Sequence, residues 1–239
     1  MFMHQAQPEE EKEDERRKMM LRYYHYRRLS PSSKNAYKAI VAAARKFSSC
    51  AVIDCVENVK AVIDAVKNDN PQLFYINWYT IFYKIEFRGY KTIIYFDYIM
   101  GRREALAYWK KSVEFAPTFC GRTDYETIKN VHDYIASCTR YDQEIVDNNG
   151  FRINDHNMIG PIYEGLAVCE GISRAAQFLL KELNVECTYQ NGYVNDGYTS
   201  GYHAWNLVRV DGKIKKMDIT WDLADDSGRI SYRYFCVAA

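Results

Sequence analysis

A cysteine, a histidine and an aspartate occur in the order that a thiol-based catalyst would use. Cys169 stands directly before a helical pattern, His203 opens a strand pattern, and Asp218 lies in a second strand pattern beyond an Asp211-Gly212 turn. A thiol, an imidazole and a carboxylate can act as nucleophile, base and orienting group. The three positions therefore predict acyl transfer through a thioester.

The position of Cys169 favours a reactive thiolate. The apolar residues that follow it have the spacing of one helix face: Ile172, Ala175, Ala176, Leu179, Leu180 and Leu183. A thiol in the first helical turn lies near free backbone N–H groups and the positive end of the helix dipole, which favour the charged form. The alternative is a small buried apolar residue, the usual role of a free cysteine. The prediction therefore depends on the other two residues.

The hairpin pattern brings His203 and Asp218 to one face of a sheet. Residues 202–210 and 213–221 alternate as strands do, and Asp-Gly is a strong signal for a two-residue turn. The resulting register places His203 opposite Thr220, with Asp218 as a diagonal neighbour. A carboxylate there can hold the proton on one imidazole nitrogen and leave the other for the thiol. Each residue alone is more simply a structural histidine or a solvated aspartate, but their joint placement favours catalysis.

Three sequence blocks around these residues resemble the signature blocks of the transglutaminase-like superfamily, in particular its bacterial, papain-like branch of cysteine-protease type. The blocks are Val168-Cys169-Glu170-Gly171, His203-Ala204-Trp205-Asn206 and Asp218-Ile219-Thr220-Trp221-Asp222, and weaker likeness extends from about residue 35. The resemblance implies Cys169 as nucleophile, His203 as general base and acid, and Asp218 as orienting group. It also implies an α+β, papain-like core in which the cysteine helix packs on an antiparallel sheet.

The chain departs from the family pattern in two ways. Relatives generally continue beyond the segment at residues 234–235, whereas this sequence stops at Ala239. The glutamine that supplies an oxyanion donor in papain-like enzymes has no counterpart before Cys169. The backbone N–H of Cys169 is one expected donor, and Tyr163 is a candidate for the second, with simple packing as the alternative. Trp205 is a candidate substrate-binding residue in the cleft, with core packing again as the alternative.

Composition narrows the class of protein. A chain of 239 residues can form one domain or a core with an appended subdomain. A formal net charge of +1 argues against binding to nucleic acid through bulk electrostatics. No apolar run of about 18 residues is present, so we expect no transmembrane segment. The seven cysteines are scattered without a CxxC pair, which argues against a metal site or a disulfide scaffold, so we expect no cofactor.

The compartment follows from the cysteines and the N-terminal charges. Scattered cysteines favour a reducing, cytoplasmic setting. Residues 8–18 are almost all charged and lack the apolar core of a signal peptide. Export stays open if a signal was removed before Met1.

Periodicity divides the chain into three regions: a charged tail at 1–20, an N-terminal helical and β-hairpin region at 21–120, and a catalytic core at 121–239. The N-terminal region should contain a helix from Ser30-Pro31 to Phe47, a second helix with a buried stripe, paired strands at 81–87 and 90–98, and a helix at 102–115. The stripe consists of Val52, Val56, Val59, Ile63 and Val66. A capping box at Thr123 should open a helix to about Cys138, with His132 as a structural residue.

The favoured function is hydrolysis of a protein or peptide amide, because water needs no dedicated acceptor site. A crosslinking transglutaminase, which passes the acyl group to an amine, uses the same triad and is an alternative. A second alternative is a protein-binding module with an idle triad. An acyl-CoA-dependent N-acetyltransferase is weaker, since no basic cluster for the CoA phosphates stands near the motif.

Overall fold

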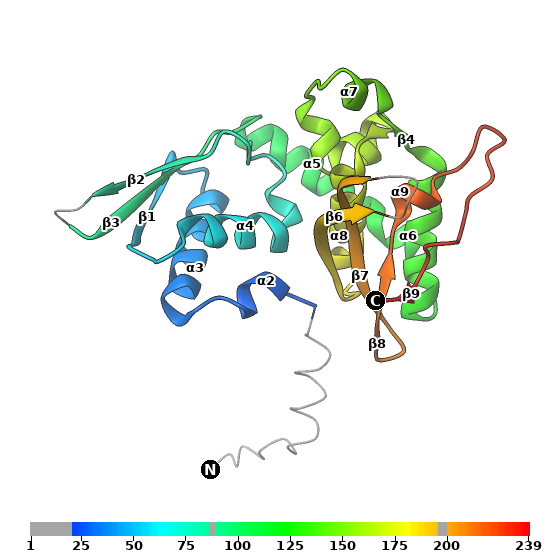
Figure 1. The fold of residues 1–239 in the computed structure, drawn as a ribbon, viewed down its shortest axis with the longest axis horizontal. Coiled ribbons are helices and arrows are strands. Elements are labelled where there is room, and N and C mark those ends of the chain that lie inside the picture. Colours follow the sequence, from blue (N-terminus) through cyan, green and yellow to red (C-terminus); the bar gives the residue numbers. More distant parts are fainter. Residues whose placement is uncertain (1–20, 87–88, 196–199) are drawn as a thin grey trace, which may run out of the picture.

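The protein forms two groups of elements that lie side by side (Figure 1). This computed structural model describes residues 21–86, 89–195 and 200–239, so the predicted charged tail at 1–20 lies outside it. The first group contains α2, α3, α4 and a three-stranded sheet, and the second contains the helices from α5 onward with a four-stranded sheet. No helix in the described ranges has both the length and the apolar character needed to cross a bilayer.

The first group combines helices with an antiparallel sheet in the order β1-β3-β2. Its elements are α2 (Tyr24–Arg27), α3 (Pro31–Arg45), β1 (Cys50–Asp54), α4 (Val59–Asp69), η1 (Pro71–Leu73), β2 (Phe82–Glu86) and β3 (Lys91–Tyr95). The predicted start of α3 is confirmed, because the Ser30 side chain accepts from the Ser33 N–H and Pro31 is the first helical residue.

The predicted stripe from Val52 to Val66 is wrong in its first part. Val52 lies in β1 and is 56% exposed, opposite Ile93 of β3. The helix starts only at Val59, where the Asn58 side chain caps it by accepting from the Ala61 N–H at 2.9 Å. A β-branched run fits a strand as well as a helix, and pairing with β3 decides between the two.

The second group contains the helices around the triad sequence. They are α5 (Arg102–Phe115), α6 (Asp124–Cys138), α7 (Gln143–Asp147) and α8 (Cys169–Glu182), with the short helices η2 (Ala116–Phe119), η3 (Ile153–His156) and η4 (Gly160–Glu164) between them. Two short parallel strands, β4 (Arg140–Tyr141) and β5 (Leu166–Ala167), join the end of α6 to the entrance of α8. As predicted, the Thr123 side chain caps α6.

A four-stranded antiparallel sheet carries the histidine strand. Its order is β6-β7-β8-β9, with β6 (Cys187–Asn195), β7 (Ser200–Val210), β8 (Lys213–Met217) and β9 (Val237–Ala238). Val210 pairs with Lys213 across the Asp211-Gly212 turn, as the sequence predicts, and both turn residues have positive φ. The second strand is shorter than predicted, because the chain turns at Asp218 into the single helical turn α9 (Ile219–Asp222).

Helix α8 is the central element of the protein. It packs against β6 and β7, and Ile172, Phe178 and Leu179 on it are fully buried. The Asn206 side chain of β7 donates to the Ser173 carbonyl at 3.0 Å. These contacts confirm the predicted α+β core in which the cysteine helix lies on an antiparallel sheet. The same helix also binds the first group, because Arg174 and Gln177 donate to backbone carbonyls at the end of α4.

Candidate active site

Cys169 is the first residue of α8 and is partly buried. Extended backbone at Val168 leads into the helix, and the Val168 N–H donates to the Asp155 carbonyl at 3.2 Å. A Cβ at Gly171 would lie 2.2 Å from that same carbonyl oxygen, so only glycine lets the η3 loop pack this closely on the first turn. The loop and the helix start therefore hold the thiol at a fixed place, where the helix dipole favours negative charge.

His203 and Asp218 meet in the interior. His203 Nε2 lies 2.9 and 3.1 Å from the two carboxylate oxygens of Asp218, and His203 is 8% exposed while Asp218 is fully buried. Burial alone would lower the pKa of His203, but hydrogen bonds to Asp218 and Cys169 raise it to about 9. Because Nε2 of His203 is hydrogen-bonded to Asp218, Nδ1 is the imidazole nitrogen that is available to the cysteine. The structure thus brings His203 and Asp218 together, and Cys169 lies close enough to affect the pKa of the imidazole.

Aromatic rings and a lysine surround the imidazole. Trp221 stacks on His203 with ring centroids 4.6 Å apart, and Trp205 lies 6.2 Å from His203 on the same strand. The ammonium of Lys216 is 3.5 Å from an Asp218 oxygen and within 5.0 Å of both indole centroids. Trp205, the candidate substrate-binding residue, therefore lies beside His203 and makes a cation–π contact with Lys216.

Tyr141 lies close to the cysteine. The β4–β5 pairing places Tyr141 opposite Ala167, two residues before Cys169. Burial raises the Tyr141 pKa to about 12, and the nearby Cys169 side chain acts in the same direction. No role for Tyr141 follows from the sequence alone.

Tyr163, the sequence candidate for the second oxyanion donor, has other partners. Its hydroxyl lies 2.7 Å from the Ser112 hydroxyl and donates to the Tyr108 carbonyl at 3.1 Å. Both partners belong to α5, and the Tyr108 ring makes an edge contact with the Tyr163 ring. The contacts of Tyr163 therefore join η4 to α5.

A buried carboxylate fixes the turn that carries Asp218. Asp222 is fully buried and accepts from the Tyr234 N–H at 3.1 Å, while the Asp218 N–H donates to the Tyr234 carbonyl. His132 of α6, also fully buried, lies 3.4 Å from Asp222 through Nε2 and 3.0 Å from Asp133 through Nδ1. His132 is therefore a structural residue that helps to anchor the triad aspartate.

Glu170, next to the cysteine, is the centre of an ionic cluster. Lys67 and Arg174 lie 2.8 and 2.9 Å from one of its oxygens, and His156 and Tyr79 contact the other. Burial would raise the pKa of this carboxyl, but Arg174, His156 and Lys67 hold it well below its usual range. The cluster ties α4 and η3 to the first turn of α8.

The remaining cysteines form no pairs, since all seven are free thiols. Within the described ranges, no three or more His, Cys, Asp or Glu residues gather where they could hold a metal ion.

Residues 115–221 match the family model described as the transglutaminase-like superfamily, and the match spans all three triad positions. Among solved structures, a candidate cysteine protease from Cytophaga hutchinsonii has 18% identity and a TM-score of 0.38, over 47% of this chain and 37% of that one. A TGase has 18% identity and a TM-score of 0.43, over 76% and 52%. The chain thus spans about half or less of the length of these two proteins. No curated protein matches it.

Proposed function

We propose that this chain, whose residues 115–221 match the transglutaminase-like superfamily model, hydrolyses protein or peptide amides through a thioester on Cys169. The observation that carries the proposal is the buried pair of His203 and Asp218, together with the influence of Cys169, at the start of α8, on the pKa of the imidazole. A raised histidine pKa favours the imidazolium, which stabilises a neighbouring thiolate.

In the first step, the Cys169 sulfur attacks the amide carbonyl carbon and forms a tetrahedral intermediate. Protonated His203 then transfers its Nδ1 proton to the leaving amine, the C–N bond breaks, and the acyl group remains on sulfur. Asp218 keeps the Nε2 proton in place and stabilises the imidazolium before transfer.

In the second step, water replaces the amine. Neutral His203 takes a proton from water through Nδ1, hydroxide attacks the thioester carbonyl, and the C–S bond breaks to release a carboxylic acid. Cys169 leaves as the thiolate, and the imidazolium is restored beside it.

Two donors would stabilise the oxyanion in both steps. The backbone N–H of Cys169 is the first, as in other acyl transferases that use a helix start. We assign the second to the Tyr141 hydroxyl, because Tyr141 lies close enough to Cys169 for that residue to affect the pKa of the phenol. Tyr163 is not assigned this role, because its hydroxyl is already hydrogen-bonded to the Ser112 hydroxyl and the Tyr108 carbonyl.

The proposal is tested first by the rate at which iodoacetamide labels Cys169 between pH 5 and 9, mapped by mass spectrometry. We expect fast labelling below about pH 7 that collapses in His203→Ala, as for a thiolate–imidazolium pair. The exposed Cys120 of the same molecule is the internal reference for the reagent. Slow labelling of Cys169 that the substitution leaves unchanged would overturn the proposal and favour a binding module with an idle triad.

The acceptor is tested with fluorescein-labelled casein, with and without a dansylated primary amine. Hydrolysis predicts new small fragments whose yield is unaffected by the amine and which Cys169→Ala abolishes. Incorporation of the amine into intact casein would instead show a crosslinking transglutaminase. Both products require the thioester, so the experiment separates the fate of the acyl group from its formation.

A further inference from the structure

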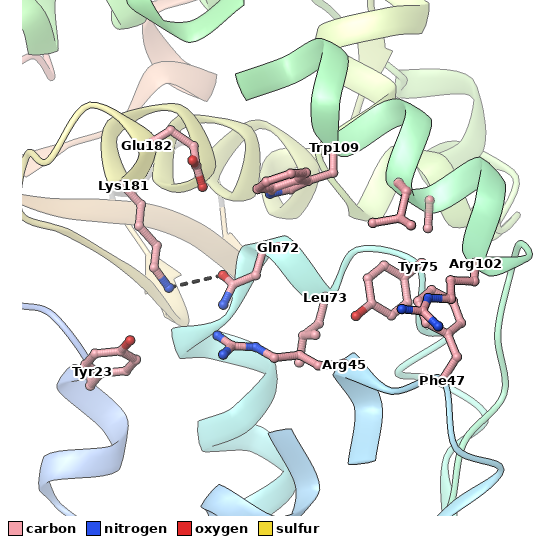
Figure 2. Close-up of a pocket in the computed structure, with 12 residues that line it drawn as sticks. Tyr23, Arg45, Phe47, Gln72, Leu73, Tyr75, Arg102, Trp109, Lys181 and Glu182 are labelled. Carbon is pink, nitrogen blue, oxygen red and sulfur yellow. Dashed lines mark hydrogen bonds between the residues drawn. The ribbon is translucent and has the colours of Figure 1, made fainter. Parts of the chain in front are cut away.

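A cavity of about 390 Å³ lies between the first group of elements and the C-terminal end of α8. Figure 2 shows it with residues from the end of α3, from η1, from α5 and from the last turn of α8 around it. Lys181 follows Cys169 by twelve helical positions, which at 1.5 Å per residue is about 18 Å along the helix axis. The cavity is therefore separate from the triad, and its volume suits a small organic ligand.

Positive charge predominates in the cavity. Arg45, Arg102 and Lys181 line it, with Glu182 as the one acidic lining residue. Neither guanidinium makes a hydrogen bond or an ion pair with any described side chain or carbonyl, although Figure 2 shows both at the cavity. Among the described residues, the Lys181 ammonium donates to two uncharged acceptors, the Asp69 carbonyl and the Gln72 side chain. Burial lowers the pKa of Lys181 to about 8, and the charge of Arg45 contributes in the same direction.

The walls of the cavity are aromatic and aliphatic. Phe47 and Tyr75 stack with ring centroids 4.3 Å apart, and Figure 2 shows Arg102 beside them. On α5, Leu106 and Trp109 are 50% and 40% exposed, although both are large apolar side chains. In Figure 2 the Trp109 indole faces the cavity from the side opposite Arg45. Flat apolar surface therefore lies next to two unpaired planar cations.

We propose that this cavity binds a small organic anion, with a carboxylate or phosphate group at the cations Arg45 and Lys181 and a flat apolar group against Trp109. Guanidinium groups bind planar or tetrahedral oxyanions through paired N–H donors, and such charge-assisted bonds are strong when the cations lack competing partners. An aromatic ligand body fits the exposed rings, which would lose contact with water on binding. The proposal does not depend on the triad chemistry.

The test is calorimetric titration of the full chain with phenyl phosphate at constant ionic strength. We expect saturable binding, weaker binding of inorganic phosphate, and none of benzyl alcohol, which has the ring without the charge. Benzoate in place of phenyl phosphate distinguishes a carboxylate from a phosphate ligand. Cys169→Ala should bind as the parent does, because the triad lies at the other end of α8.

Matched variants locate the ligand. Arg45→Gln and Lys181→Gln should each weaken phenyl phosphate binding by about tenfold or more, the loss expected for a hydrogen bond to a charged group. Lys46→Gln and Arg103→Gln remove the neighbouring exposed cations, which do not line the cavity, and should change the affinity by no more than about twofold. Thermal melts of all four confirm that they fold.

Three results would overturn the proposal. The first is no saturable binding of either aromatic anion up to about 10 mM, well above the range of specific small-ligand sites. The second is an equal loss in the neighbouring controls, which would show attraction to general positive charge. The third is equally tight binding of inorganic phosphate, which would show that the apolar walls contribute nothing.

Discussion

The imidazole of His203 lies nearly parallel to the indole of Trp221, with ring centroids 4.6 Å apart and an angle of 8° between the planes. Trp221 belongs to α9, the turn that begins directly after Asp218. The same short segment therefore holds the ring by its face through Trp221 and by its edge through Asp218. The two contacts together restrict rotation of the imidazole.

Replacing the orienting carboxylate tests this arrangement. In Asp218→Asn the side chain keeps its shape but loses its charge and can present an amide N–H to His203. We expect amide hydrolysis to fall by about 10²–10⁴-fold, because the wrong tautomer is favoured and the imidazolium loses its counter-ion. Casein hydrolysis and the rate of Cys169 labelling at pH 6 both measure the loss. Asp226→Asn, at an exposed position, is the control and should leave both rates unchanged. An Asp218→Asn protein as active as the parent would contradict the role assigned to Asp218.

The raised pKa of His203 also predicts how stability depends on pH. The folded-state value is about 9, against about 6.5 for an unfolded histidine. Protonated His203 therefore stabilises the fold fully below about pH 6.5, and this contribution is lost as the pH rises through 9. We expect the parent to lose about 3 kcal/mol more unfolding free energy than His203→Gln between pH 6 and 10.

Urea denaturation at several pH values measures that difference. Lys181 has a lowered pKa and acts in the opposite direction, but it is present in both proteins and cancels in the comparison. A difference between parent and variant that stays constant from pH 6 to 10 would show that His203 does not titrate as the geometry requires.

Tyr141→Phe separates oxyanion stabilisation from activation of the thiol. Removing the hydroxyl should lower kcat for casein hydrolysis by about 10²-fold, the cost of one oxyanion donor. Labelling of Cys169 by iodoacetamide forms no oxyanion and should change by no more than about threefold. Tyr125→Phe, at an exposed position on α6, is the matched control. Equal losses in both assays would assign Tyr141 to the thiol instead of to the oxyanion.

Much of this site could be predicted from local sequence signals. The apolar spacing after Cys169 and the Asp211-Gly212 turn are sufficient for the start of α8 and the register of β7 with β8. The end of β8 could not be predicted, because it depends on the contacts of Asp222 with Tyr234 and His132. His132 is distant in the sequence, and Tyr234 lies outside any motif. Local periodicity holds no information about such contacts.

The position of Tyr141 near Cys169 could not be predicted from local sequence either. Its approach to Cys169 depends on a parallel pairing between two strands of two residues each, Arg140–Tyr141 and Leu166–Ala167. Strands this short have no recognisable alternation, and parallel partners can be far apart in the chain. The predicted start of α4 is too early for a different reason. The β-branched residues of β1 continue the apolar spacing of the helix, so periodicity alone includes the strand in the helix.

The ionic cluster at Glu170 gives a prediction for acid pH. Its carboxyl contacts Lys67 and Arg174 and is 13% exposed. Because these cations hold its pKa well below the usual range, the ionised group stabilises the fold above about pH 4.5, and this contribution is lost as the pH falls further. The parent should therefore lose more stability than Glu170→Gln on acidification from pH 5 to 3.

At pH 7 the same variant should be less stable than the parent by about 2–4 kcal/mol, because Lys67 and Arg174 would remain buried without a counter-ion. Urea denaturation of the two proteins at pH 7, 5 and 3 measures both effects. Glu104→Gln, exposed in the first turn of α5, controls for the loss of one surface carboxylate. A Glu170→Gln protein as stable as the parent at pH 7 would mean that the cluster contributes little to joining α4 and α8. The substitution should also loosen the first turn of α8 around Cys169, because Glu170 is the next residue. The contacts of Glu170 with His156 and Lys67 hold that turn.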